Sequence, residues 1–243
     1  MTRDDDRDAL YAGAMPRAGD FVFDAAVAAV FPDMISRSVP GYAAVVNTIR
    51  LLAERYAQAG SNLVDLGCSL GAATVALAAG AAGRGCRVIG VDNAPAMLER
   101  AAGSAAAEYP GIEWRCADIR DVELGDCSVV VLNFTLQFLP AQDRLRLLQR
   151  VGGALRPGGV LLLSEKIRAA DAEGDSLLTE LHHAFKQANG YSELEISRKR
   201  AALERVLVPE DLQTHRDRLT QAGFGRVDLW FQCFNFASLI ARR

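Results

Sequence analysis

The chain contains few cysteines, and their spacing excludes a disulfide-rich protein and a zinc-binding protein. The 243 residues contain five cysteines, an odd number, and no two of them form a C-x-x-C pair. Disulfide frameworks and zinc sites need paired, closely spaced cysteines, so neither fits. We expect reduced thiols, as in a cytosolic protein, and no metal site. The cysteines are Cys68, Cys86, Cys116, Cys127 and Cys233.

Long apolar segments are also missing. The most apolar stretches, Val129–Leu139 and Val160–Leu163, are too short for a membrane-spanning helix, which takes about 20 apolar residues. The first residues, MTRDDDRDALYAG, are charged and lack the apolar core of a signal peptide. We therefore expect a cytoplasmic protein that makes no membrane contact.

Basic residues are not in excess. Lys and Arg number 27 against 30 Asp and Glu, for a formal net charge of -3. Nucleic-acid binding needs clustered cations, so no direct contact with nucleic acid is expected. Hydrophobic residues make up 50% of the chain and charged residues 23%, as in an ordinary globular protein. The length suits one α/β domain with a modest insertion.

The N-terminal part predicts helices before any strand. Residues 1–20 are polar and small, and we expect a flexible tail there. Apolar residues then recur at helical spacing from Val22 to Phe31, and Pro32 is expected to end that helix. A second amphipathic helix is predicted over Tyr42–Ala57.

From residue 62 onward, short apolar strands alternate with helices. This order predicts a parallel sheet covered on both faces. Residues from about 168 to 221 are mostly helical and form an insertion after the fifth strand, and two adjacent strands close the chain. The predicted strands are Asn62–Leu66, Arg87–Asp92, Ile112–Cys116, Ser128–Asn133, Val160–Ser164, Val227–Phe234 and Phe236–Ala241.

The turn after the first predicted strand is rich in glycine. It reads DLGCSLG (Asp65–Gly71) and leads into an Ala-rich helix. Glycine allows a tight turn and lets a ligand approach the backbone. The second strand ends in Asp92, where a carboxylate can receive ribose hydroxyls. Dinucleotide binding is the nearest alternative, but the turn lacks the middle glycine of G-x-G-x-x-G.

This pattern resembles the class I methyltransferases, whose glycine-rich turn wraps the methionine part of S-adenosyl-L-methionine. The resemblance implies one Rossmann-like domain over residues 21–243, with a seven-stranded, mostly parallel sheet and an antiparallel strand at its C-terminal end. It also implies the cofactor contacts. Gly67, Cys68 and Ser69 would flank the amino-acid portion, Asp92 the ribose, Asn93, Asp118 and Ile119 the adenine, and Asn133 would close the floor.

Three of these positions have alternative interpretations. Asp118 also fits an acid that caps a surface turn, and Asn93 also fits the N-cap of a helix ahead of Pro95. Cys68 has no visible base beside it, so its backbone is a better contact than its thiol.

The adjacent His182 and His183 have no metal-ligand partner at helical spacing, and one of them is expected to be structural.

Longer motifs run through nearly the whole chain, in order. They are VFPDMISRSVPGY (Val30–Tyr42), DLGCSLGAAT (Asp65–Thr74), VDNAPAM (Val91–Met97), VVLNFTLQFL (Val130–Leu139), LSEK (Leu163–Lys166), HHAFKQANGYSELEISRKR (His182–Arg200) and LWFQCFNFASL (Leu229–Leu239). With these motifs the chain resembles the carboxy-S-adenosyl-L-methionine synthases, which act in the bacterial pathway to 5-oxyacetyl uridine at the tRNA wobble position.

The resemblance implies carboxyl transfer rather than methyl transfer. Prephenate would donate a carboxyl group to the S-methyl carbon of S-adenosyl-L-methionine, giving carboxy-S-adenosyl-L-methionine and phenylpyruvate. The product would pass to a tRNA carboxymethyltransferase. We also expect a homodimer, formed through the charge-rich helical stretch His182–Leu207.

The resemblance implies two further site residues. Arg200 would bind the new carboxylate, because a guanidinium makes a two-point bond that lysine cannot reproduce. The alternative is that Arg198–Arg200 is a solvated basic run on a helix. Tyr42 would contact the cofactor, and the alternative is a core aromatic residue with a wet hydroxyl.

Two other classes of function stay open. A methyltransferase acting on a small molecule is the main alternative, although no proline follows Asn133 as in the motif of many amino and base methyltransferases. A non-catalytic cofactor-binding protein is the second. It would have no use for Arg200 near a positive sulfur, unless an anion binds there too.

Overall fold

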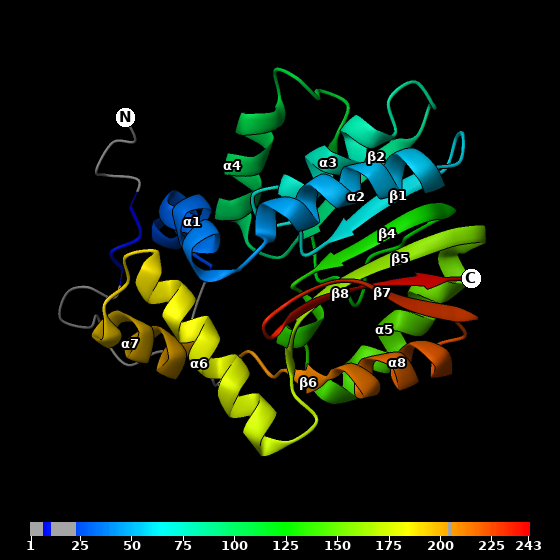
Figure 1. The fold of residues 1–243 in the computed structure, drawn as a ribbon. Coiled ribbons are helices and arrows are strands. Elements are labelled where there is room, and N and C mark those ends of the chain that lie inside the picture. The colour runs from blue at the N-terminus through cyan, green and yellow to red at the C-terminus, as the bar shows by residue number, and fades with distance from the viewer. Residues whose placement is uncertain (1–6, 11–22, 204–205) are drawn as a thin grey trace.

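The computed structural model describes residues 7–10, 23–203 and 206–243, and Figure 1 shows their arrangement. Most of the predicted tail, residues 1–20, lies outside the described residues. The short segment 7–10 is described, and Asp8 within it is buried. No helix among the described residues has the length and apolar character needed to cross a membrane.

Two helices precede the first strand, α1 (Ala25–Ser38) and α2 (Tyr42–Tyr56). The prediction that Pro32 ends the first helix is wrong, because α1 continues through it for six more residues. Met34 and Ser38, beyond the proline, are buried. Their packing stabilises the last turns and offsets the backbone hydrogen bond that proline cannot donate.

A mostly parallel sheet forms the centre of the molecule. Seven strands follow the order β3-β2-β1-β4-β5-β8-β7, and a two-residue strand, β6, pairs with the end of β5. β8 pairs antiparallel with β5 and β7, and the other strand pairs of the described sheet are parallel, which confirms the predicted Rossmann-like fold. The strands are β1 (Asn62–Leu66), β2 (Arg87–Asp92), β3 (Glu113–Cys116), β4 (Cys127–Asn133), β5 (Leu155–Arg168), β6 (Glu210–Asp211), β7 (Arg226–Cys233) and β8 (Phe236–Arg242).

Alternate residues of the central strands pack into two cores, one on each face of the sheet. In β4, Val130 and Leu132 belong to the core that α5 (Ala141–Ala154) and α8 (Leu212–Gln221) cover. Val129 and Val131 belong to the core under α2 and α3 (Ala72–Gly80). Successive strand residues point to opposite faces, so a strand covered on both sides is apolar throughout.

The range predicted as a helical insertion, residues 168–221, contains α6 (Ala172–Ala188) and α7 (Glu193–Leu203), and also β6 and α8, which pack beside the sheet. Several hydrogen bonds join α6 and α7 to α1, including that from Lys199 of α7 to Ser38 Oγ at 3.0 Å. His182 Nε2 lies 2.8 Å from the Ser38 carbonyl oxygen, and Arg37 Nε donates to the Asn189 carbonyl at 2.7 Å. As a result α1, α6 and α7 lie together beyond the carboxyl ends of the parallel strands (Figure 1).

Candidate active site

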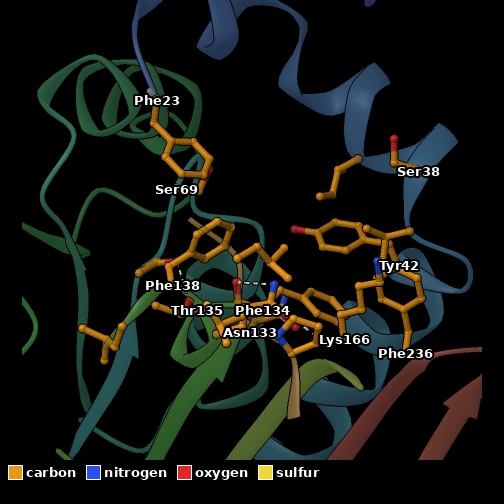
Figure 2. A pocket seen from close by; sticks show the side chains of 18 of the residues that line it. Phe23, Ser38, Tyr42, Ser69, Asn133, Phe134, Thr135, Phe138, Lys166 and Phe236 are labelled. Carbon is orange, nitrogen blue, oxygen red and sulfur yellow. Dashed lines mark hydrogen bonds between the residues drawn. The ribbon is translucent and has the colours of Figure 1, made fainter. Parts of the chain in front are cut away.

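A cavity of about 780 Å³ lies at the carboxyl ends of strands β1 to β5, and residues of α1, α6 and α7 also line it. Open parallel sheets bind ligands at this edge, and small-molecule sites have volumes of this order. Figure 2 shows part of the lining. Every site residue predicted from the sequence lines it, namely Tyr42, Gly67, Cys68, Ser69, Asp92, Asn93, Asp118, Ile119, Asn133 and Arg200. Their individual roles stay predictions.

The glycine turn brings backbone to the cavity. Gly67 has a φ of 79°, and a Cβ there would lie 2.3 Å from Thr135 Cγ2, so only glycine fits. The N–H groups of Gly67 and Cys68 both donate to the Val91 carbonyl of β2, at 2.8 and 2.9 Å. Burial raises the pKa of the Cys68 thiol far above its ordinary value, which suits a backbone contact better than a nucleophile.

Two backbone N–H groups hold the Asp92 carboxylate in place. Its Oδ2 accepts the Ser69 N–H at 2.8 Å, and its Oδ1 accepts the Ala94 N–H at 2.9 Å. Burial raises the pKa of this carboxyl, and the backbone hydrogen bonds partly oppose the rise. A carboxylate has about four lone-pair sites, so Asp92 keeps acceptor capacity for the hydroxyls of a ligand.

The loops after β2 and β3 carry Asn93 and Asp118, two of the residues predicted to surround the adenine. Ala94 is the N-cap of α4 (Pro95–Ala105) and no side chain caps that helix, so the N-cap alternative for Asn93 does not hold. Asp118 does cap a turn, since its Oδ1 accepts the Arg120 N–H at 2.9 Å, yet it also lines the cavity. The hydrogen bonds from Arg120 lower the pKa of Asp118.

Three buried oxygens of cavity-lining residues have no hydrogen-bond partner among the described residues: Asp65 Oδ1, Asn133 Oδ1 and Asn235 Oδ1. Thr74 Oγ1 donates to the other oxygen of Asp65 at 2.7 Å, and burial raises the pKa of Asp65 to about 7. A buried acceptor without a donor costs roughly 1–3 kcal/mol, so these oxygens suit a ligand that donates hydrogen bonds. Asp65 is not among the site residues predicted from the sequence, although it begins the glycine motif.

Three aromatic side chains, those of Tyr42, Phe134 and Phe236, form one wall of the cavity. The rings of Tyr42 and Phe134 lie 6.3 Å apart, and those of Phe134 and Phe236 lie 5.9 Å apart. Figure 2 shows all three beside Lys166. Burial raises the pKa of the Tyr42 phenol well above its ordinary value, so the phenol stays neutral. Tyr42 thus belongs to the aromatic wall and lines the cavity. This placement agrees with a cofactor contact and also with a core aromatic residue that has a wet hydroxyl.

Glu165 shapes the loop that carries Asn133 and Phe134. The carboxylate is 2% exposed and accepts the N–H groups of Leu136 and Gln137, both at 2.9 Å. These residues begin the short 3₁₀ helix η2 (Leu136–Phe138). Burial raises the pKa of Glu165 to about 8. Glu165 is not among the residues predicted from the sequence, since nothing in the local sequence shows that an acid in a strand bonds a distant turn.

The basic run Arg198–Arg200 is not a uniformly solvated face. Lys199 is 4% exposed, and its ammonium lies 3.3 Å from Asp8 Oδ2 and 3.0 Å from Ser38 Oγ. Arg200, one residue on, is exposed and lines the cavity. The two neighbours therefore have different surroundings, and Arg200 is placed where a ligand in the cavity can reach it.

His182 is structural, as one of the two histidines was expected to be. Its bond to the Ser38 carbonyl joins α6 to α1, and its ring packs on the edge of Phe236 at 4.9 Å. Burial lowers the pKa of His182 to about 3, so it stays neutral. Within the described ranges, no group of His, Cys, Asp and Glu is arranged to hold a metal ion.

Fold and cavity together define the class: a Rossmann-like methyltransferase domain. The family model described as "Methyltransferase domain" matches residues 63–159. A Methanococcus maripaludis structure, described as a putative S-adenosyl-L-methionine-dependent methyltransferase, aligns over 95% of this chain and 97% of its own at a TM-score of 0.59 and 17% identity. Human N-acetylserotonin methyltransferase in complex with SAM aligns over 90% of this chain and 55% of its own, at 0.62 and 18%.

Curated relatives narrow the class to one family. A carboxy-S-adenosyl-L-methionine synthase of Trichlorobacter lovleyi is 54% identical over 96% of this chain and 97% of its own length. One of Haemophilus ducreyi is 50% identical over 97% of both chains. The chain belongs to the carboxy-S-adenosyl-L-methionine synthase family of enzymes, which confirms the resemblance seen in the motifs.

Proposed function

We propose that this enzyme converts S-adenosyl-L-methionine and prephenate into carboxy-S-adenosyl-L-methionine and phenylpyruvate. The observation that carries the proposal is that Arg200 lines the same cavity as the residues predicted to hold S-adenosyl-L-methionine. The chain is also 50–54% identical to two synthases over 96–97% of its length. A methyl-transferring enzyme would have no use for a guanidinium at a positive sulfur.

The cavity fits S-adenosyl-L-methionine chemically. The partnerless oxygen of Asp65 suits the ammonium group of its methionine part, and the spare lone pairs of Asp92 suit the ribose hydroxyls. The carboxylates of Asp65 and Asp92 also attract the positively charged sulfur of S-adenosyl-L-methionine. In the proposal, Asn93, Asp118 and Ile119 border the adenine, and the backbone of residues 67–69 borders the amino acid.

The proposed reaction balances without another reagent. Prephenate loses its ring carboxyl group as carbon dioxide, the bond electrons make the ring aromatic, and hydroxide leaves. The S-methyl carbon gives up a proton, which the hydroxide takes, and the carbanion, stabilised by the sulfonium, bonds the carbon dioxide. Water would protonate such a carbanion, so the protein has to hold both reactants dry and aligned. The wall of Tyr42, Phe134 and Phe236 serves this purpose.

We further propose that the product serves the 5-oxyacetyl modification of wobble uridine in tRNA. A separate tRNA carboxymethyltransferase would use it, and this chain would not contact the tRNA. The protein would be cytoplasmic and would act as a homodimer through the helical insertion.

Mass spectrometry of the small molecule that co-purifies with the protein tests the proposal. We expect a species one carbon dioxide heavier than S-adenosyl-L-methionine, and its formation from added S-adenosyl-L-methionine and prephenate. Unmodified S-adenosyl-L-methionine alone, even after incubation with prephenate, would overturn the proposal. S-adenosylhomocysteine together with a methylated small molecule would support the alternative, a small-molecule methyltransferase.

A further inference from the structure

All three lysines of this chain line the same cavity. They are Lys166 of β5, Lys186 of α6 and Lys199 of α7, and every other cation among the 27 Lys and Arg is an arginine. An ammonium is a compact charge that can lose its proton when buried, whereas a guanidinium stays charged. The lysines of this chain are therefore all found at the cavity. There, a compact cation that can lose its proton behaves differently from an arginine.

Helix α6 presents one face to the cavity. Its lining residues, Asp175, Thr179, His182, His183 and Lys186, follow the spacing of a single helical side. Asp175, the only acid among them, is eleven residues before Lys186, about 16 Å along the helix axis. Asp175 also lies 3.8 Å from Arg168 and accepts the Ala169 N–H. The Lys186 end of this wall is thus basic.

Lys186 is a buried cation without a counter-charge. Its side chain is 7% exposed, and no carboxylate among the described residues forms an ion pair with it. The charges that act on it come from Lys166, Lys199 and Arg200, and all are positive. Lys186 lies in the last turn of α6, where the helix dipole favours a cation, yet burial and these neighbours still lower its pKa to about 7. A buried charge left unpaired is costly, so this place suits an anion.

We propose that Lys186, with Lys166 near it, binds a carboxylate of the second substrate, a small dicarboxylic acid, while Arg200 serves the carboxylate that forms on the sulfonium side. The identity of that acid as prephenate rests on the proposed function. The cavity is then divided by charge: aspartates at the ends of β1 and β2 face the cationic substrate, and the lysines of β5, α6 and α7 face the anionic one.

The first test replaces Lys186 by the uncharged Met, with the exposed Arg100→Met on α4 as the matched loss of a cation. For Lys186→Met we expect the KM for prephenate to rise at least about 30-fold, the scale of losing one partner of a buried charge pair. Affinity for S-adenosyl-L-methionine, measured by calorimetry, should not change. Arg100→Met should match the parent. An unchanged KM for prephenate in Lys186→Met would overturn the proposal.

Thermal unfolding separates binding from structure. Removing an unpaired buried charge should leave the Tm of the ligand-free protein the same or higher, because methionine fills the same space without desolvating an ammonium. A lower Tm, with equal losses of affinity for both substrates, would assign Lys186 to the fold and overturn the proposal.

Lys186→Arg adds a pH profile that a structural role would not move. An anion raises the pKa of Lys186, so the parent should bind prephenate best below pH 7 and more weakly as the pH rises above about 7. The arginine variant should bind with a flat profile there. The other charged groups at the Lys186 end of the cavity are Lys166, Arg200, the Lys199–Asp8 pair and the Asp33–Arg37 pair of α1. His182 and His183 also lie there, and burial lowers the pKa values of both from their ordinary value of 6.5. All remain in both proteins. Equal pH profiles would contradict the proposal.

A second probe keeps this inference separate from the proposed function. If the parent makes no carboxylated product, the proposed function fails, and calorimetry with phenylsuccinate, an unreactive aromatic dicarboxylate, decides the anion site alone. Binding to the parent that Lys186→Met loses supports the site. Binding to neither protein, or equally to both, overturns it.

Discussion

In the proposed reaction, Arg200 distinguishes the carboxylated product from S-adenosyl-L-methionine. Arg200→Ala should bind S-adenosyl-L-methionine as the parent does, because a cation gains nothing beside a positive sulfur. It should lose preference for the carboxylated compound by about 1.5–3 kcal/mol, the scale of a hydrogen bond to a charged group. Arg200→Lys should recover little, since an ammonium cannot make the forked contact. Competition binding of the two compounds measures the difference.

Arg198→Ala is the matched control, since Arg198 is half-buried on the same helix and does not line the cavity. If Arg200→Ala weakens both compounds equally, Arg200 is structural. If it weakens neither, the solvated-run interpretation is right for Arg200, although Lys199 beside it is buried.

Among the elements, the short helix η2 depends on one carboxylate from β5. Glu165→Ala would leave the buried N–H groups of Leu136 and Gln137 without an acceptor, at roughly 1–3 kcal/mol each. We expect the free energy of unfolding to fall by about 2–6 kcal/mol and S-adenosyl-L-methionine to bind more weakly, because Asn133 and Phe134 precede this turn. Glu165→Gln, which keeps one acceptor, should lose less. Urea unfolding and calorimetry measure both effects.

The same carboxyl makes stability depend on pH. Because burial raises the pKa of Glu165 from 4.5 to about 8, the folded protein binds this proton more tightly than the unfolded chain does. The stabilisation is complete below 4.5 and is lost as the pH rises toward 8. Asp65, with a pKa raised to about 7, acts in the same direction. Glu165→Gln should therefore show a flatter stability profile between pH 5 and 8; a profile as steep as that of the parent would contradict this assignment.

For the whole molecule, the insertion offers an apolar surface away from the cavity. Leu177 and Leu181 of α6 are 54% and 38% exposed, lie four residues apart on one side of the helix, and do not line the cavity. We predict that this side of α6 forms the homodimer contact. Light scattering at micromolar concentration should report a dimer for the parent and a monomer for Leu177→Glu with Leu181→Glu.

Leu51→Glu on α2, where the leucine is 52% exposed, is the matched control and should stay dimeric. A monomeric parent would refute the dimer, and a dimeric double variant would place the contact elsewhere. The insertion would then serve only as the wall of the cavity.

The sequence by itself determined the parallel sheet and the glycine turn. Both follow from local patterns: apolar runs that must bury two faces, and a strand followed by Gly67 and Gly71, which adopt positive φ. Asp92 could be predicted for the same reason, because it ends the next strand. Arg200 came from the motif resemblance, since a basic run alone favours solvent.

Only the tertiary structure decided which polar groups are buried and what they face. Lys186 and Asp65 are unexceptional in the sequence, and Glu165 gives no sign that it bonds a turn 28 residues earlier. Asp8, in a segment expected to be a tail, is the partner of buried Lys199, far along the chain. Burial and pKa depend on contacts between segments distant in sequence, and no local pattern records them. The division of one cavity into an acidic and a basic part therefore arises only when α6 and α7 pack over the ends of the strands.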